Sequence, residues 1–169
     1  MKQSARHILK DVSRSFYLSM RLLPKAMREP VSLAYLLARA SDTLADTEGL
    51  AAELRHEMLL GFGEILHGAE RTAWLVKLRD EVIPCQQHQG ETSLLKMMDE
   101  VFAWFHDFKD HQGHAAILKV MDHILHGQML DIERFEIGQS SGLTQDAQLE
   151  EYCFLVAGCV GEFWTELGY

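Results

Sequence analysis

The chain is poor in the residues that mark extracellular, nucleic-acid-binding and disordered proteins. It contains three prolines and three cysteines in 169 residues, and its 16 basic residues are outnumbered by 25 acidic ones. The resulting net charge of −9 disfavours binding to a nucleic-acid backbone, which needs a basic face. Hydrophobic residues make up 47% of the chain, too much for a disordered segment and enough for a substantial core. These values predict one globular domain over residues 1–169.

Long apolar runs are also missing. The longest, "CFLVAGCVG", has less than half of the roughly 20 residues that cross a bilayer. The N-terminal stretch "MKQSARHILKDVSRSF" breaks its apolar residues with charges, unlike a signal peptide. Cys85, Cys153 and Cys159 are an odd number without metal-ligand spacing, which predicts reduced, buried thiols. We therefore expect a cytoplasmic protein, with peripheral membrane contact left open.

No segment shows the alternation of a β-strand, and nearly every segment has helical periodicity. The pattern predicts an all-α fold with helices over residues 4–22, 30–47, 50–68, 71–83, 91–108, 113–136 and 147–168. Pro30 is expected in the first turn of its helix. The last predicted helix is apolar on several faces, so we expect it to be central in the bundle, or else covered by an oligomer partner or a complementing chain.

The stretch "ASDTLAD" places two aspartates, Asp42 and Asp46, on one face of an otherwise apolar helix, about 40° apart. Arg39 and Tyr35 continue the same stripe. Two carboxylates one turn apart repel each other unless positive charge lies between them. Arg39 supplies some of that charge, and Mg²⁺, which binds one or two carboxylates together with substrate phosphates, would supply more. The alternative is a solvated helix face with an Arg–Asp pair, because D-x-x-x-D is common by chance.

Three motifs, "SRSFYLSMRLLP", "AYLLARASDTLAD" and "YCFLVAGCVGE", resemble, in the same order, those of the squalene/phytoene synthase family. The resemblance implies an isoprenoid-synthase-type helical bundle. It also implies Mg²⁺-dependent head-to-head condensation of two farnesyl or geranylgeranyl diphosphates to squalene, phytoene or a relative. Use of NADPH is left open by the sequence.

The resemblance also implies roles for the residues at the diphosphate end of the pocket. Asp42 and Asp46 would hold Mg²⁺, Arg39 would contact the diphosphate as a catalytic residue, and Tyr35 would lie beside it. Another segment at this end consists of Ser13, Arg14, Ser15 and Phe16. Ionisation of an allylic diphosphate releases an anion, so cationic groups are the chemistry expected there.

For the hydrocarbon end, the resemblance implies that Tyr152 lies near the reacting carbons as a second catalytic residue. Three positions would line the prenyl channel: Val156, Ala157 and Gly161. Ionisation leaves a carbocation, which needs a dry cavity and is attracted to aromatic faces. Gly158 and Gly161 are costly within a helix, so they predict either a close approach of a ligand to the backbone or tight helix packing.

Two features depart from the family pattern. Ala45 replaces an acidic residue common in the squalene-synthase version of the first motif, and residues 1–169 contain no N-x-x-R-D-x-x-E-D segment. The resemblance therefore implies the N-terminal part of a synthase. A non-catalytic helical module that binds a lipid or a protein partner is the alternative function.

Other sites have weaker support. Two E-x-x-H spacings, Glu53/His56 and Glu64/His67, lie on one predicted helix, whereas di-iron bundles place them on two. No serine-hydrolase elbow, P-loop or dinucleotide-binding glycine pattern occurs. Asp131, in a stretch that resembles the family's G-M-x-x-D segment, is left without a role, and a surface or helix-capping contact is favoured for it over catalysis.

Overall fold

The computed structural model describes residues 18–137 and 142–168, and within these ranges it contains helices and no strands, which confirms the all-α prediction. The α-helices are α2 (Lys25–Ala45), α3 (Ala52–Leu66), α4 (Thr72–Lys77), α5 (Gln89–Lys96), α6 (Met98–Asp107), α7 (His114–Asp131), α8 (Asp146–Cys153) and α9 (Cys159–Gly168). Three π-helical turns and a 3₁₀ turn extend them: η1 (Leu78–Val82), η2 (Ile83–Cys85), η3 (Ile132–Ile137) and η4 (Phe154–Gly158).

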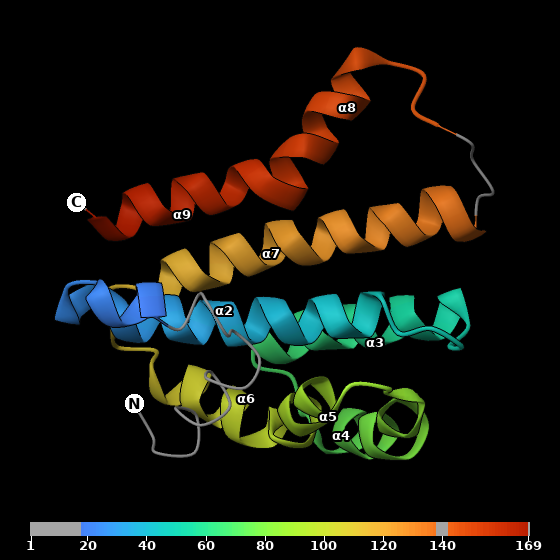
Figure 1. Cartoon of the computed structure of the whole chain (residues 1–169), viewed down its shortest axis with the longest axis horizontal. Helices are drawn as coiled ribbons and strands as arrows, with labels where there is room; N and C mark the ends of the chain where they lie inside the picture. The colour runs from blue at the N-terminus through green and yellow to red at the C-terminus, as the bar shows by residue number, and fades with distance from the viewer. Residues whose placement is uncertain (1–17, 138–141, 169) are drawn as a thin grey trace.

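The helices form layers that are stacked on the α2–α3 pair (Figure 1). Helices α4, α5 and α6 cover one side of this pair, and α7 covers the other. The α8–η4–α9 segment lies on the outer side of α7. Helix α2 contacts α3, α5, α6 and α7 and is therefore central.

Helix α2 has this place because most of its side chains are apolar at helical spacing. Leu33, Leu36 and Leu37 are fully inaccessible to solvent. The helix begins at Lys25, after the extended residue Pro24, so Pro30 lies inside the helix and not in its first turn as predicted. Pro24 ends the preceding segment, and the helix tolerates Pro30 although that residue cannot donate to the carbonyl group four positions earlier.

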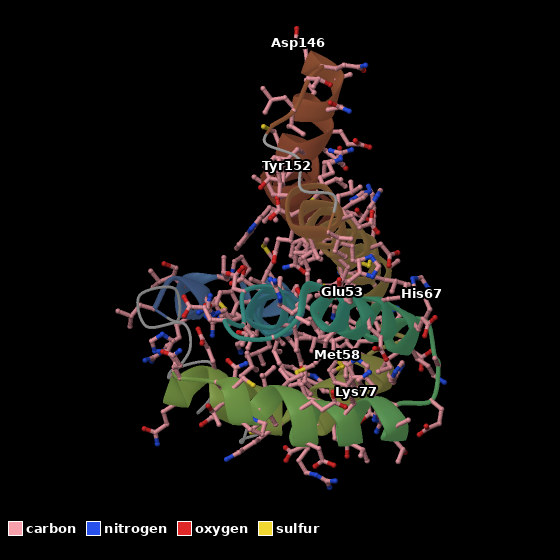
Figure 2. All side chains as sticks on the ribbon, turned by 90° about the vertical axis from the view of Figure 1, so that its right-hand side faces the viewer. Glu53, Met58, His67, Lys77, Asp146 and Tyr152 are labelled. Carbon is pink, nitrogen blue, oxygen red and sulfur yellow. The ribbon has the colours of Figure 1, made fainter. Side chains whose placement is uncertain are left out.

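An aromatic cluster joins α3 to the layer below it. Phe62 of α3 packs edge to face with Trp74 of α4 and Phe102 of α6, with ring centroids 5.8 and 4.9 Å apart. The Trp74 indole N–H donates to the Met58 carbonyl oxygen at 2.9 Å. Figure 2 shows Met58 pointing from α3 toward the layer that contains Lys77. Buried aromatic pairs with a satisfied indole stabilise such an interface.

The helix boundaries differ from prediction where local geometry changes. The helix predicted over residues 91–108 is interrupted at Met97, whose N–H donates to the Leu94 carbonyl three positions back. The helices predicted over residues 113–136 and 147–168 contain the π turns η3 and η4. Periodicity averaged over a whole helical segment does not resolve a single π turn, and such turns occur frequently at functional sites.

The prediction that the last helix is central is wrong for the described part of the chain. Cys159 and Phe163 pack toward α7, but Val156 on the η4 turn is 45% exposed. The cysteine prediction needs a similar correction. All three thiols are free, as predicted, but Cys153 is exposed and Cys85 half-buried, so burial is confirmed for Cys159 alone. In the described ranges, no helix combines the length and apolarity that a bilayer span requires.

Candidate active site

A cavity of about 770 Å³ lies between α2, α3, α7–η3 and the α8–η4–α9 segment. Six of the predicted site residues line it: Tyr35, Arg39, Asp42, Asp46, Tyr152 and Val156. The first four lie on or directly after α2, and the last two come from the opposite end of the chain (Figures 1 and 2). Chain folding therefore brings the acidic stretch and the Tyr152 segment to one space.

The aspartate pair occupies the C-terminal end of α2. Asp46 is the capping residue, and its backbone N–H donates to the Asp42 carbonyl oxygen at 2.9 Å. The C-terminus of a helix carries partial negative charge, so it is an unfavourable place for a carboxylate. The pKa of Asp46 is raised above its ordinary value, first by loss of hydration and then by the Asp42 charge, with Arg39 and Arg55 acting in the opposite direction. This carboxylate therefore lacks sufficient compensating positive charge.

Arg39 is bound by carboxylates from two elements. Its Nη1 group donates to Asp42 Oδ2 and its Nη2 group to Glu91 Oε1, both at 2.7 Å. Glu91 comes from α5, and sequence pattern alone does not connect it to Arg39, because helical spacing relates residues within one helix only. Arg39, Asp42 and Asp46 also line a second cavity of about 230 Å³ on the Glu91 side.

Arg55 of α3 is a second cation in the wall of the larger cavity, and no motif in the sequence marks it. Its Nη1 group donates to the Ala45 carbonyl oxygen at 2.6 Å and to Glu136 Oε1 at 3.0 Å, and its Nη2 group pairs with Glu136 Oε2. The Ala45 carbonyl is one of the groups that a helix C-terminus leaves without an internal partner. Arg55 therefore fastens the end of α2 to η3, beside the aspartate pair.

Tyr152 lies near Asp131 of α7, which also lines the cavity. Loss of hydration, followed by the Asp131 charge and hydrogen bonding to that carboxylate, raises the pKa of Tyr152. The pKa of Tyr35 is raised as well, mainly by burial. Asp131 thus lies in the cavity wall. The sequence had favoured a surface or helix-capping contact for this residue. Because Asp131 belongs to another helix, the sequence around Tyr152 does not indicate that the two residues are neighbours.

Other predicted residues are not brought to the cavity. Ala157 and Gly161 are exposed and are not among its lining residues. A Cβ atom added to Gly161 would meet no atom of the described part within 4 Å. The close approach occurs at Gly127 of α7 instead, where an added Cβ would lie 3.0 Å from Leu155 Cβ. The four residues of the predicted N-terminal segment, Ser13, Arg14, Ser15 and Phe16, lie outside the described residues.

The residues present fit a hard divalent cation with few protein ligands. Within residues 18–137 and 142–168, no group of three or more histidine, cysteine, aspartate or glutamate side chains is arranged to hold a metal ion. Mg²⁺ commonly uses one or two carboxylates and completes its shell with water and substrate phosphates, so Asp42 and Asp46 meet its needs. In the E-x-x-H pairs, His56 contacts Glu133 at 2.7 Å and His67 contacts Asp122 at 2.9 Å.

Comparison with known proteins places the sequence in a family. The family model described as squalene/phytoene synthase matches residues 9–169. The squalene synthase of Solanum lycopersicum is 29% identical over 90 residues, which are 53% of this chain and 22% of that protein. Squalene synthase BSS of Botryococcus braunii is 42% identical over 57 residues, which are 34% of this chain and 12% of that protein. The matches thus span less than a quarter of these relatives' own length. With nearly the whole chain matched by the family model, this protein belongs to the squalene/phytoene synthase family.

Proposed function

We propose that this chain provides the substrate site for the Mg²⁺-dependent head-to-head condensation of two prenyl diphosphates, farnesyl or geranylgeranyl, in isoprenoid biosynthesis. One observation carries the proposal: the aspartate pair, Arg39 and Tyr152 line a single cavity, although they come from distant parts of the chain. Its volume of about 770 Å³ is within the range of about 300–1,000 Å³ typical of small-molecule sites.

The charge of the cavity wall supports a role for a metal ion. Among the described lining residues, four carboxylates (Asp42, Asp46, Asp131 and Glu136) face two guanidinium groups (Arg39 and Arg55). Both guanidinium groups are already paired with carboxylates. A diphosphate would be repelled by this net negative charge unless a cation bound with it. Bound Mg²⁺ would supply this charge and stabilise the departing diphosphate.

Part of the cavity lining suits the hydrocarbon part of the substrate. Ile124, Ile132, Val156 and Val160 supply apolar side chains, and Tyr152 supplies an aromatic ring. A carbocation formed near Tyr152 would be attracted to the negative face of the ring, and the apolar walls would keep water from it. In the proposed reaction, Arg39 binds the diphosphate and Tyr152 stabilises the developing positive charge.

The test is release of pyrophosphate from farnesyl or geranylgeranyl diphosphate by the purified chain, with Mg²⁺ and with EDTA. We expect release that needs Mg²⁺ and that Asp42→Asn abolishes without unfolding the protein. Normal turnover in Asp42→Asn would contradict the assignment of this residue. Equal binding of prenyl diphosphate with and without EDTA would contradict the metal role of both aspartates.

A non-catalytic module that binds a lipid or a protein partner is the second candidate. Residues 1–169 contain one D-x-x-x-D pair, whereas a diphosphate is held more firmly when carboxylate-bound metal ions approach it from two sides. This function predicts that prenyl diphosphate binds but that no pyrophosphate is released, so the same assay separates the two functions.

A further inference from the structure

The Arg39 guanidinium is fixed by two carboxylates that approach its two terminal nitrogens separately. Asp42 accepts from Nη1 and Glu91 accepts from Nη2, each at 2.7 Å. Glu91 is 52 positions from Arg39 in the sequence and belongs to another helix. Hydrogen-bonded partners at both tips of a planar group restrict its rotation, which a partner at one tip does not.

Glu91 is well placed to act as a rigid holder. It lies in the first turn of α5, where the helix dipole stabilises a carboxylate. Its side chain is 22% exposed, against 46% for Asp42, so it has less freedom to move into water. Helix α5 packs directly on α2, so the position of Glu91 relative to Arg39 is set by backbone packing.

A guanidinium has five N–H donors in a rigid plane. The two carboxylates each take one, and the remaining donors lie in the plane that the two ion pairs define. Arg39 lines both cavities, whereas Glu91 lines the smaller one only. A group held in this way keeps its remaining donors in a fixed plane, so an anion that reaches Arg39 can be bound without a reorganisation step.

We propose that Glu91 is a positioning residue that orients Arg39 for binding the diphosphate of the substrate. The inference rests on the proposed function, in which Arg39 binds that diphosphate. Glu91 lies on the far side of Arg39 and acts through it. The ligand that Arg39 would bind is a magnesium-bound diphosphate. Two oxygens of one phosphate group can accept hydrogen bonds from a guanidinium of fixed orientation.

Length and charge of the Glu91 side chain can be separated by two variants. Glu91→Asp keeps the charge but withdraws the carboxylate by one methylene, so it cannot reach Nη2 at 2.7 Å while α5 stays packed. Glu91→Gln keeps the length and an acceptor oxygen but removes the charge. A positioning role therefore predicts a loss of binding in Glu91→Asp and little change in Glu91→Gln, whereas a purely electrostatic role predicts the reverse ranking.

The experiment measures binding of inorganic pyrophosphate in the presence of Mg²⁺ by isothermal titration calorimetry, using the full chain. We expect Glu91→Asp to weaken binding about tenfold, the scale of one charge-assisted hydrogen bond, and Glu91→Gln to stay within about twofold of the wild type. The matched control is Glu57→Asp, which shortens a carboxylate paired with Lys77 outside both cavities. It should bind pyrophosphate as the wild type does. Unchanged binding in Glu91→Asp would overturn the inference and leave the proposed function intact.

A second measurement does not depend on pyrophosphate. The ¹⁵N NMR signals of the Arg39 Nη groups, assigned with Arg39→Lys, report how fast the guanidinium rotates. Rotation should be slow in the wild type and in Glu91→Gln, and faster in Glu91→Asp. Equal rotation rates in all three would overturn the inference. Failure of the wild-type chain to bind pyrophosphate with Mg²⁺, by contrast, would count against the proposed function.

Discussion

At the scale of single residues, the site keeps charges where the fold alone would not favour them. Asp46 lies at the negative end of α2 and one turn from Asp42, and its pKa is raised by loss of hydration and by that neighbour. A glycine or an asparagine is the usual choice near such a helix end. An acidic residue in this place costs stability, and the proposed Mg²⁺ site would account for its presence.

Asp46→Asn should make the protein more stable at pH 7. Because the folded-state pKa of Asp46 is raised above 3.8, the folded protein binds more protons than the unfolded chain just above that pH, and stability falls as the carboxyl ionises. The substitution removes this loss. We expect a gain of about 0.5 kcal/mol, the scale of an exposed charge at a helix end.

The measurement is urea unfolding of both proteins at pH 7 and at pH 3. The gain should be present at pH 7 and absent at pH 3, where the wild-type carboxyl is protonated in both states. A lower stability of Asp46→Asn at pH 7 would show that this carboxylate stabilises the fold. It would contradict the inference that Asp46 is unfavourable at the end of α2.

At the scale of elements, the cavity is bounded by contacts between helices that are distant in sequence. Arg55 connects α3, the last carbonyl of α2 and the π turn η3. Gly127 lets η4 approach α7 closely enough for Leu155 to pack on its backbone. Helix ends leave carbonyl groups that need partners, and in this protein an arginine from another helix supplies one.

Arg55→Gln should destabilise the fold by about 2 kcal/mol, because it leaves Glu136 unpaired and weakens the contact with the Ala45 carbonyl. The Arg55 side chain is 12% exposed and Glu136 is half-exposed, so we expect less than the full effect of breaking a buried pair. Urea unfolding of the variant measures the change.

Arg71→Gln is the matched control for this prediction. It breaks the pair between Arg71 and Asp99, whose carboxylate is largely exposed, and should cost less than about 0.5 kcal/mol. Equal losses in the two variants would mean that Arg55 is an ordinary surface pair and that the end of α2 is held by packing alone.

At the scale of the whole molecule, the cavity joins α2 to the last described helices. Its walls include α2 at one end of the chain and α8, η4 and α9 at the other. A ligand that bridges these walls would therefore stabilise most of the fold and not just one helix. The melting temperature of the entire chain measures this stabilisation directly.

Mg²⁺ with pyrophosphate should raise the melting temperature of the chain. A ligand at 100 times its dissociation constant stabilises the folded state by about 2.7 kcal/mol, and for a domain of this size that corresponds to roughly 5–10 °C. EDTA should abolish the shift, and Asp46→Asn should reduce it. A shift of the same size in the presence of EDTA would contradict a metal-assisted site.

Local sequence pattern determined which residues of each helix share a face. The spacing of Tyr35, Arg39, Asp42 and Asp46 defined a polar ridge on an apolar helix. Helical periodicity without any β-type alternation indicated the all-α class. The three motifs indicated the family by resemblance. None of these steps needs knowledge of which helices pack together, because each depends on residues that are close in the chain.

Tertiary structure alone decided what stands opposite that ridge. It brought Tyr152 and Val156 to the same cavity, gave Arg39 its second carboxylate in Glu91 and gave the end of α2 its partner in Arg55. It also left Ala157 and Gly161 on an exposed face. Periodicity specifies the direction of a side chain around its own helix axis, whereas the partner it meets depends on the packing of all the helices together.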